Sequence, residues 1–514
     1  MHALPERIGL GRISKIMAKH RRFATVVVAL LLSSAAHSAS DPQIARVETG
    51  LLPIAATKLG VPGTLEDRLR AYGVPGLSVA VIDAGKIAWA KGYGVADTGS
   101  GRLVTTRTLF QAASISKPVS ALGVLVLVQK GFLQLDENVN DALKSWKIPE
   151  NDFTRNRPVT VRMLLNHTAG VGRSESNGYV PFSVADKLPS ILQVLRGEPP
   201  ARSGAVSVVS LPGRSFAYSG AGYEILQQLL VDVSGEPFEQ YMQTEVLDPI
   251  GMANSTFAQP LPESLLSLAA TGHYAGGKPL PGRFRVSPEL AVAGLWTTPT
   301  DIAKYVINVQ RSYAGSIQSP LSSSMTRQML TPGEGGRGLG PAMSGRSQSI
   351  RFGHDGFNEG FESAVVAYVH NGQGAVVMAN SGFAYMLIRE VLDSISHVYG
   401  WPEYGAIGQQ PPSASIHQQL VIPVSASVLA SSAGQYELDN TEISIHRSNG
   451  RLFLEWPGNG SAEIFATPGG RFFCPQLIFS DVGSPWLQFI QGPNAGTTKI
   501  MAGDDGSIEL RRVN

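Results

Sequence analysis

The sequence predicts a mixed α/β (α+β) protein: an antiparallel sheet flanked by helices, with a helical subdomain, is followed by a C-terminal all-β, barrel-like domain. Three observations predict this fold class. Strand-like runs stand near both ends of residues 40–404, long helical patterns lie between them, and residues 426–514 alternate apolar and polar residues between turn signals. At 514 residues the chain is too long for one ordinary domain and holds enough apolar sequence for sizeable cores.

The N-terminus has the form of a secretory signal peptide. A basic region comes first, with Lys15, Lys19, Arg21 and Arg22. The apolar run FATVVVALLLSSAA follows, and then small residues around positions 36–39. The run is shorter than the ~20 residues of a membrane-spanning helix, and polar HSASD comes after it, so we expect cleavage rather than an anchor. Residues 1–39 are therefore predicted to be the signal peptide of an exported protein, periplasmic or secreted, with Met17 as an alternative start.

The first two predicted elements of residues 40–404 are a hairpin and a buried helix. GLSVAVIDAGKIAWAKGYGVAD holds two strand-like runs around the tight turn DAGK, and we expect this hairpin at the edge of a sheet. In SKPVSALGVLVLVQKG, Pro118 suits a first helical turn and Gly131 suits the C-terminal end. The run between them is apolar almost throughout, so this helix is predicted to be buried on most sides.

The remaining elements complete the predicted order. VTVRMLLNHTAGV, AGYEILQQLLVDVSG and PFEQYMQTEVLDPIGM indicate helices, and ESAVVAYVHNGQGAVVMAN indicates a second hairpin about residues 371–374, before a helix at YMLIREVLDSISHVY. Residues 405–425, which begin with GAIGQQPPSASIHQQ, have the composition of a linker. Residues 426–514 then carry the turn signals SNG, PGNG, TPGG, NAG and DDG, which are typical of an antiparallel barrel or sandwich.

Charge and cysteine content exclude several classes of function. Forty-two Lys and Arg against 40 Asp and Glu leave a net charge of +2, so the chain lacks the basic footprint of a nucleic-acid binder. Cys474 is the one cysteine, so the fold does not depend on an internal disulfide; we expect this thiol to be buried and inert. No Cys or His cluster has metal-ligand spacing, and no G-x-S-x-G elbow is present.

The stretch FQAASISKPV places Ser114 three residues before Lys117 at the start of the predicted buried helix. Residues three apart share a helix face, so the amine can come within the about 3 Å that it needs to activate the hydroxyl as a nucleophile. The backbone N–H of Ser114 would also point toward a developing oxyanion. Taken alone, the tetrad is better explained as a helix cap beside a lysine, because Ser is a common cap and S-x-x-K is frequent by chance.

Two later stretches favour the catalytic interpretation. PGRSFAYSGAGYEILQQLL puts Tyr218 just before a helix, and RFGHDGFNEGFES puts His354 in a Gly-rich bend. Alone, Tyr218 would be a core tyrosine and His354 a loop histidine. The order S-x-x-K, Y-x-x and a basic residue with x-G resembles the serine β-lactamase and penicillin-binding-protein superfamily, in the branch of class C β-lactamases, esterases of that fold, D-aminopeptidases and D,D-carboxypeptidases. LLNHTAGV and AGLWTTPTDIAKY are also similar to that branch, and the resemblance spans residues 74–399.

The resemblance implies a β-lactamase/transpeptidase-like fold and a role for each matching residue. Ser114 is then the acylated nucleophile, and Lys117 accepts or relays its proton. Tyr218 is the second base, which protonates the leaving group and later activates water. His354 stands where the family commonly has Lys, and would hydrogen-bond the Tyr218 oxygen or meet a substrate carboxylate. His167, in LLNHTAGV, is interpreted as a turn or capping residue outside the catalytic set.

The resemblance also implies a substrate-binding set and draws attention to two departures. Phe357 supplies the second oxyanion-hole N–H beside that of Ser114, and Gly356 and Ser219 belong to the same set. Gly220 stands where the second motif usually ends in Asn, so the side-chain amide is missing. Asp355 replaces a small or hydroxyl residue and would repel an anionic substrate.

These expectations together predict an exported serine hydrolase that forms an acyl-enzyme on Ser114, with neither metal nor organic cofactor. Its substrates would be small esters or amides, as for a carboxylesterase or a D-amino-acid peptidase or amidase, or a cell-envelope peptide. A β-lactam-hydrolysing, class C-like enzyme is the first alternative. The second is a binding or scaffold protein that keeps the fold without turnover, since fold alone does not determine function.

Overall fold

The computed structural model describes residues 42–51, 63–173, 182–316, 319–382, 384–404, 426–438, 441–448, 450–456, 460–466, 472–474, 486–491, 497–502 and 508–513. The chain divides into two compact units, residues 1–46 and 47–514; of the first, only the start of one helix is described. The predicted signal peptide and linker lie outside the described residues, so both stay predictions. In the described part of the chain, no helix has the length and apolar character needed to cross a membrane.

Seven strands of the described residues form one antiparallel sheet in the order β10-β11-β12-β13-β1-β2-β3. Their bounds are β1 (Gly76–Asp83), β2 (Lys86–Asp97), β3 (Arg102–Leu103), β10 (Ala342–Ser344), β11 (Arg351–Asn358), β12 (Phe361–Tyr368) and β13 (Gly374–Ala379). Strands from the two ends of the domain meet where β1 pairs with β13, with Leu77 opposite Ala379. The predicted mixed fold class is therefore confirmed.

Both predicted hairpins are present, but the first does not lie at the edge of the sheet. β1 and β2 pair across the turn at Asp83 and Lys86, and β12 pairs with β13. β1 is flanked by β13 and β2, and β3 lies outside β2. The physical reason is that β1 is buried along nearly its whole length, and a strand buried on both faces belongs inside a sheet.

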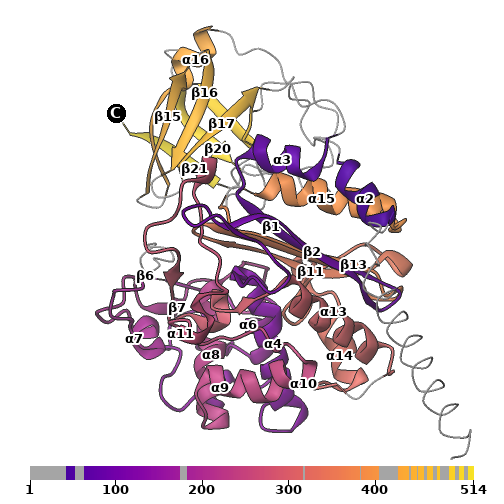
Figure 1. Ribbon diagram of the computed structural model, residues 1–514. Coiled ribbons are helices and arrows are strands. Elements are labelled where there is room, and N and C mark those ends of the chain that lie inside the picture. Colours follow the sequence, from indigo (N-terminus) through magenta and orange to yellow (C-terminus); the bar gives the residue numbers. More distant parts are fainter. Residues whose placement is uncertain are drawn as a thin grey trace, which may run out of the picture. The chain divides into compact units, whose positions relative to one another are not determined.

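Helices cover both faces of this sheet (Figure 1). α3 (Leu65–Tyr72) and α15 (Tyr385–Val398) lie on one face, and α13 (Pro299–Tyr313) lies on the other with the helical subdomain. That subdomain includes α4 (Ser116–Gln129) and α8 (Gly220–Ser234). The remaining helices are α2 (Pro42–Thr49), α5 (Val139–Ala142), α6 (Val161–Leu165), α7 (Ile191–Arg196), α9 (Phe238–Met242), α10 (Asp248–Ile250), α11 (Glu263–Leu266), α12 (Leu290–Ala293) and α14 (Ser323–Met329).

Short turns and strand pairs connect these helices. The 3-10 turns are η1 (Ala113–Ile115), η3 (Ala275–Gly277), η4 (Glu334–Gly336) and η5 (Ser347–Ser349), and η2 (Gln243–Leu247) is a short π-helix. The pairs are β4 (Phe110–Gln111) with β9 (Trp296–Thr297), β5 (Val171–Arg173) with β7 (Val206–Val208), and β6 (Phe182–Ser183) with β8 (Arg285–Val286).

α4 is the buried helix that the sequence predicts. Every residue from Ser116 through Leu127 is buried. Pro118 lies in its first turn, and Gly131, just past its end, has φ +80°. A Cβ at Gly123 would lie 2.6 Å from the sulfur of Met242, so glycine lets the chain pack directly against the helix. The N-terminal end of α4 is therefore held rigidly, and it carries the S-x-x-K tetrad.

The C-terminal strands form a closed antiparallel barrel, as predicted. They are β14 (Gly434–Leu438), β15 (Thr441–Ser448), β16 (Arg451–Trp456), β17 (Gly460–Ala466), β18 (Phe472–Phe473), β19 (Trp486–Gln491), β20 (Thr497–Ala502) and β21 (Ile508–Val513), after α16 (Ala426–Ser432). β14 pairs with β21 to close the ring. Cys474 is buried in the barrel core, which confirms its predicted burial.

Candidate active site

Ser114 lies in η1, one turn before α4 rather than inside it. The turn is tied to the segment after α12, because the N–H of Ala112 donates to the Leu295 carbonyl at 2.9 Å and the N–H of Leu295 donates to Ser116 Oγ at 3.0 Å. Ala113 has φ +49°, a left-handed conformation that is costly for a residue with a Cβ. The surrounding contacts therefore hold the backbone beside the candidate nucleophile in a strained shape.

Two hydrogen bonds converge on the hydroxyl oxygen of Ser114. Lys117 Nζ donates to Ser114 Oγ at 2.9 Å, and Tyr218 Oη donates to the same oxygen at 3.0 Å. Lys117 is only 1% exposed, and its Nζ lies 4.9 Å from the centroid of the Tyr218 ring. The structure thus brings together three of the residues that the sequence singles out, across 104 positions of the chain.

A backbone carbonyl gives Lys117 a further partner. Lys117 Nζ donates to the carbonyl of Val292 in α12 at 3.2 Å. A Cβ at Gly220 would have a single near neighbour, Val292 Cγ1 at 3.5 Å. α12 therefore packs against Gly220, the position where the resemblance leads one to expect Asn. Lys117 thus has a main-chain oxygen as a partner, while position 220 carries no side-chain amide.

His167 positions the tyrosine, a role that the sequence does not reveal. Its backbone has φ +61°, in line with the predicted turn. Its Nδ1 accepts a hydrogen bond from the N–H of Ser219 at 3.1 Å, and its ring packs on Tyr218 at 4.5 Å. Burial, with Arg337 and Lys117 nearby, holds the pKa of His167 well below its usual range, so the ring is neutral and Nδ1 can accept.

Ser219, which the sequence assigns to the substrate-binding set, caps a helix in the structure. Its Oγ accepts a hydrogen bond from the N–H of Gly222 at 3.2 Å and so caps the start of α8. Its side chain is absent from the residues that line the cavity at Ser114. The hydroxyl is engaged in helix capping, which the position of a serine before a helix already favoured.

β11 presents His354 and Gly356 to Ser114. A Cβ at Gly356 would lie 2.3 Å from the Ala112 carbonyl oxygen, so only glycine lets the strand approach η1 this closely. His354 Nδ1 donates to the Asp355 carbonyl at 2.6 Å. Burial, with Arg337 and Lys117, holds the pKa of His354 well below its usual range.

His354 is therefore a neutral imidazole whose Nε2 is an acceptor. Among the described residues this atom has no hydrogen-bond partner. The expected hydrogen bond between His354 and the Tyr218 oxygen is not made, since the Tyr218 hydroxyl donates to Ser114. The other expected contact of His354, with a substrate carboxylate, stays a prediction. Its ring centroid lies 6.0 Å from that of Tyr218, so the two rings pack as neighbours.

The backbone of β11 directs the N–H of Phe357 away from β12. The N–H of Val369 donates to the carbonyl of Ile350. The backbone N–H and C=O groups of the even-numbered β11 residues therefore point toward β12, and those of the odd-numbered residues point away from it. Asp355 is an odd-numbered residue, and its carbonyl accepts a hydrogen bond from the His354 side chain. Phe357 is also odd-numbered, so its N–H points away from β12. The Phe357 side chain is 44% exposed. This direction suits the predicted oxyanion role, which remains a prediction.

A cavity of about 520 Å³ opens along this strand. On the Ser114 side it is lined by Ser114, Phe216, Tyr218, Arg337, His354 and Gly356, and it continues over the strand to Asp355, Glu362, Tyr385 and Arg389. Because successive side chains alternate, Asp355 points to the face opposite His354. The expected repulsion of an anionic substrate is thus weakened, since this carboxylate is turned away from Ser114.

Two carboxyl groups line the far side of the cavity: Asp355 is exposed, whereas Glu362 is buried. Burial raises the pKa of Glu362 to about 8, although the backbone N–H groups of Ala384 and Tyr385 donate to its carboxylate and oppose the shift. Glu362 is therefore largely protonated at neutral pH.

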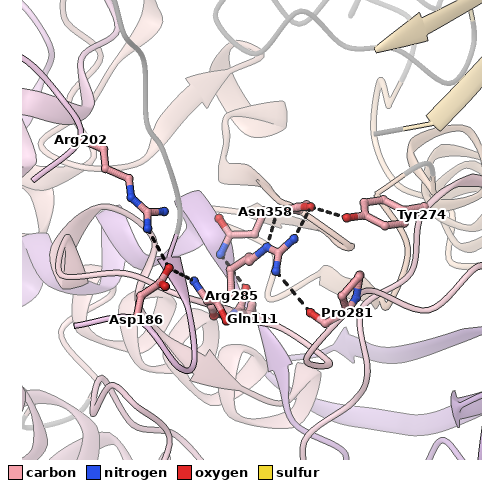
Figure 2. A network of polar contacts seen from close by, with 9 residues as sticks. Gln111, Asp186, Arg202, Tyr274, Pro281, Arg285 and Asn358 are labelled. Carbon is pink, nitrogen blue, oxygen red and sulfur yellow. Dashed lines mark hydrogen bonds and ion pairs between the residues drawn. The ribbon is translucent and has the colours of Figure 1, made fainter. Parts of the chain in front are cut away.

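A polar network fixes the end of β11 beside the strand that leads to Ser114 (Figure 2). Asn358 Nδ2 donates to Gln111 Oε1 at 3.0 Å, and Gln111 Nε2 donates to the Arg285 carbonyl at 2.7 Å. Arg285 makes a two-point ion pair with Glu359 at 2.7 and 3.0 Å, which Tyr274 Oη joins at 2.7 Å. β4, β8 and the turn after β11 are thereby held together around the candidate site.

The described residues contain no group of three or more His, Cys, Asp or Glu side chains arranged to hold a metal ion. The chemistry available in the cavity is that of a hydroxyl, an amine, a phenol, an imidazole and backbone N–H groups. Such a set is suited to acyl transfer through a serine.

Comparison with known proteins identifies the family. The model of the Beta-lactamase family matches residues 62–390, more than half of the chain, so the protein belongs to the Beta-lactamase family. Protein flp of Staphylococcus aureus (strain MW2) is 25% identical over 335 residues, 63% of this chain and 63% of that protein. Penicillin-binding protein 4* of Bacillus subtilis (strain 168) is 23% identical over 464 residues, 84% of this chain and 93% of that protein. The chain thus spans less than two thirds of the length of protein flp.

Solved structures share the fold. The D-amino acid amidase from Ochrobactrum anthropi SV3 matches with a TM-score of 0.56 and 21% identity, covering 70% of this chain and 99% of that chain. The octameric penicillin-binding protein homologue from Pyrococcus abyssi matches with a TM-score of 0.55 and 21% identity, covering 86% and 97%. The predicted superfamily is confirmed, and the chain has the serine-hydrolase fold of β-lactamases and penicillin-binding proteins.

Proposed function

We propose that the protein is an exported serine hydrolase that cleaves esters or amides through an acyl-enzyme on Ser114. The observation that carries this proposal is the convergence of Lys117 Nζ and Tyr218 Oη on Ser114 Oγ, at 2.9 and 3.0 Å. A hydroxyl held by an amine and a phenol, at the mouth of a cavity, is an activated nucleophile.

The proposed reaction has two steps. Ser114 Oγ attacks the substrate carbonyl while its proton passes to Lys117, which requires an amine that is uncharged or shares a proton with Tyr218. The N–H groups of Ser114 and Phe357 stabilise the oxyanion, and Tyr218 protonates the departing oxygen or nitrogen as the carbonyl bond to it breaks. Water, deprotonated by Tyr218, then attacks the acyl-enzyme; the bond between the carbonyl carbon and Ser114 Oγ breaks, Lys117 returns its proton to Ser114 Oγ, and the acid is released.

Substrates of the carboxylesterase or the D-amino-acid peptidase or amidase type come first. The fold neighbours include a D-amino acid amidase and SurE with D-Leu, which supports this class. β-lactams rank second, because Gly220 lacks an amide side chain and His354 is neutral where the family commonly has Lys. Export is supported by the basic and apolar run of residues 15–39, and a small peptide of the cell envelope is a suitable substrate there.

Intact-protein mass spectrometry tests the proposal. The wild type, Ser114→Ala and a control, Ser100→Ala, are each incubated with a p-nitrophenyl ester, a D-amino acid amide and a penicillin. We expect an acyl adduct or turnover in the wild type and the control, and neither in Ser114→Ala. A wild type that forms no adduct and turns nothing over would support the non-catalytic scaffold, and rapid penicillin turnover would support the β-lactamase alternative.

Export is tested separately. The full-length chain is expressed in a Gram-negative host, and the mass of the protein in the periplasmic fraction is measured. We expect a mature N-terminus near Ala39 or Ser40. Uncleaved protein confined to the cytoplasm contradicts the signal peptide without bearing on the chemistry at Ser114.

A further inference from the structure

We propose that Asn358 is a positioning residue of the oxyanion hole: its side-chain amide ties the end of β11 to the segment that carries Ser114 and so holds the backbone N–H of Phe357 in place. The inference rests on the proposed function, in which that N–H stabilises the oxyanion. Asn358 does not line the cavity at Ser114, so it acts through Phe357 and not by touching the substrate.

The N–H of Phe357 lies on an edge of β11 that strand pairing does not fix. Among the described strands, β10 pairs only with Arg351, Phe352 and Gly353, so the following half of β11 has no neighbouring strand on that side. An N–H that binds an oxyanion must stay free of strand hydrogen bonds, because each backbone N–H is a single donor. Its position therefore has to be set by contacts outside the strand pairing.

The side chain of Asn358 makes such contacts from the residue next to Phe357. Its Nδ2 donates to Gln111 Oε1 at 3.0 Å (Figure 2). The same nitrogen donates to the carbonyl of Ala293 at 3.3 Å. Gln111 is buried and lies three positions before Ser114. One amide group thus joins the strand that carries Phe357 to β4, the strand that leads to the nucleophile.

Main-chain carbonyls fix the orientation of both amides. The Ala293 carbonyl only accepts, so the amide nitrogen of Asn358 must face it. In the same way the Arg285 carbonyl requires the nitrogen of Gln111, which leaves the Gln111 oxygen to accept from Asn358. This chain of hydrogen bonds has one satisfied arrangement and therefore holds a single geometry.

α12 links this contact to the amine of the site. A helix leaves its last carbonyls without partners inside the helix. The Val292 carbonyl of α12 accepts from Lys117 Nζ. The next carbonyl, that of Ala293, accepts from Asn358. The C-terminal end of one short helix therefore positions both the amine of the site and the end of β11.

A second tie comes from the neighbouring strand. Ser363 Oγ in β12 donates to the Ala112 carbonyl at 3.1 Å. Because Ser363 pairs with Gly356, this bond holds the middle of the β11–β12 pair, whereas Asn358 holds the end of β11. Phe357 lies between the two ties. Removal of the Asn358 amide should therefore displace the Phe357 N–H without detaching the strand.

Binding of a transition-state analogue tests this role. Phenylboronic acid forms a tetrahedral adduct with a serine oxygen and places a boronate oxygen where the oxyanion develops. Its inhibition constant is measured for the wild type, Asn358→Asp and Asn358→Ala, which both lose the donor, while only the first adds a charge. Asn371→Asp and Asn371→Ala are the matched controls. Asn371 is exposed and makes the same kind of bond, to Gln373 Oε1 at 2.7 Å, and neither residue lines the cavity.

Kinetics separate the oxyanion hole from general support of the site. We expect both Asn358 variants to bind the boronate about tenfold to hundredfold more weakly, and to lose a similar factor in the acylation rate with p-nitrophenyl acetate. The matching thionoacetate should lose less, because its C=S sulfur accepts hydrogen bonds weakly. The ratio of ester to thionoester rates should therefore fall in the Asn358 variants and stay at the wild-type value in the Asn371 variants.

Two results overturn the proposal when circular dichroism shows the Asn358 variants to be folded. One is a boronate affinity equal to that of the wild type. The other is a loss of rate by one factor for ester and thionoester alike, since Asn358 would then support the site only as a structural residue. A wild type that neither binds the boronate nor is acylated contradicts the proposed function, and the oxyanion hole with it. An active wild type with unaffected Asn358 variants contradicts this inference alone.

Discussion

Lys117 and Val292 are joined by a hydrogen bond of 3.2 Å from the buried amine to a backbone carbonyl. The bond crosses 175 positions of the chain, and a Cβ at Gly220 would lie 3.5 Å from a methyl carbon of the same Val292. A main-chain oxygen in a packed helix cannot be lost by substitution of its own side chain. Lys117 is therefore held toward Ser114 by the backbone of α12.

Lys117→Met should abolish most acylation while the protein stays folded. Methionine keeps the volume of this buried side chain but removes the group that takes the proton of Ser114, so we expect the burst rate with a p-nitrophenyl ester to fall by roughly 10²–10⁴-fold. Stopped-flow burst kinetics measure the rate, and circular dichroism checks the fold. An unchanged burst in a folded variant would rule out the proton-relay role.

Gly356→Ala should damage the site, because the new Cβ would lie 2.3 Å from the Ala112 carbonyl and push β11 away from η1. Overpacking of this kind costs typically about 1–3 kcal/mol. We expect a lower Tm and a loss of ester hydrolysis. Gly220→Ala is the matched comparison, since its Cβ meets only Val292 at an ordinary 3.5 Å. Its Tm should stay close to that of the wild type, and equal Tm losses in the two variants would contradict the packing argument.

The two buried histidines predict acid sensitivity. The pKa values of His167 and His354 are held well below their usual range in the folded protein, whereas in the unfolded chain they lie near about 6.5. Below that pH the two histidines bind protons in the unfolded chain but stay neutral in the folded protein, so the free energy of unfolding decreases as the pH falls. Glu362 changes the stability in the opposite direction over this range, so the effect is measured in a Glu362→Gln background, where Tm should decrease by roughly 3 °C or more between about pH 7.5 and 5.5. Adding His354→Gln to that background should make the decrease smaller, and an equal slope with and without His354→Gln would disprove the assignment.

Glu362 predicts the opposite trend between about pH 4.3 and about pH 8. Its pKa is raised to about 8 in the folded protein, against about 4.3 in the unfolded chain. Between these values the folded protein holds a proton that the unfolded chain has lost, so stability falls as the pH rises through this window. Glu362→Gln keeps an acceptor for the N–H of Ala384 and should be the more stable protein at about pH 8. Glu137→Gln, at an exposed site, serves as the control, and parallel Tm curves for all three proteins would refute the shift.

Several elements of this protein were determined by the sequence itself. α4 and both hairpins follow from periodicity and turn residues, which act over a few neighbouring positions. The capping role of Ser219 is also local and was open to prediction from its place before a helix. Ser114, Lys117, Tyr218 and His354 indicated one site because their order along the chain resembles that of the β-lactamase and penicillin-binding-protein superfamily. Each motif by itself does not identify a catalytic residue.

Tertiary structure alone decided what surrounds these residues. Nothing in the local pattern of Val292, His167 or Arg337 indicates that the first accepts a hydrogen bond from Lys117, that the second packs on Tyr218, or that the third lies over two rings. The first hairpin lies inside the sheet for a related reason, since β1 acquires its neighbour β13 from the other end of the domain. Local structure depends on backbone preferences over a few residues, whereas these contacts arise only when distant segments pack together and leave one carbonyl or one guanidinium facing the site.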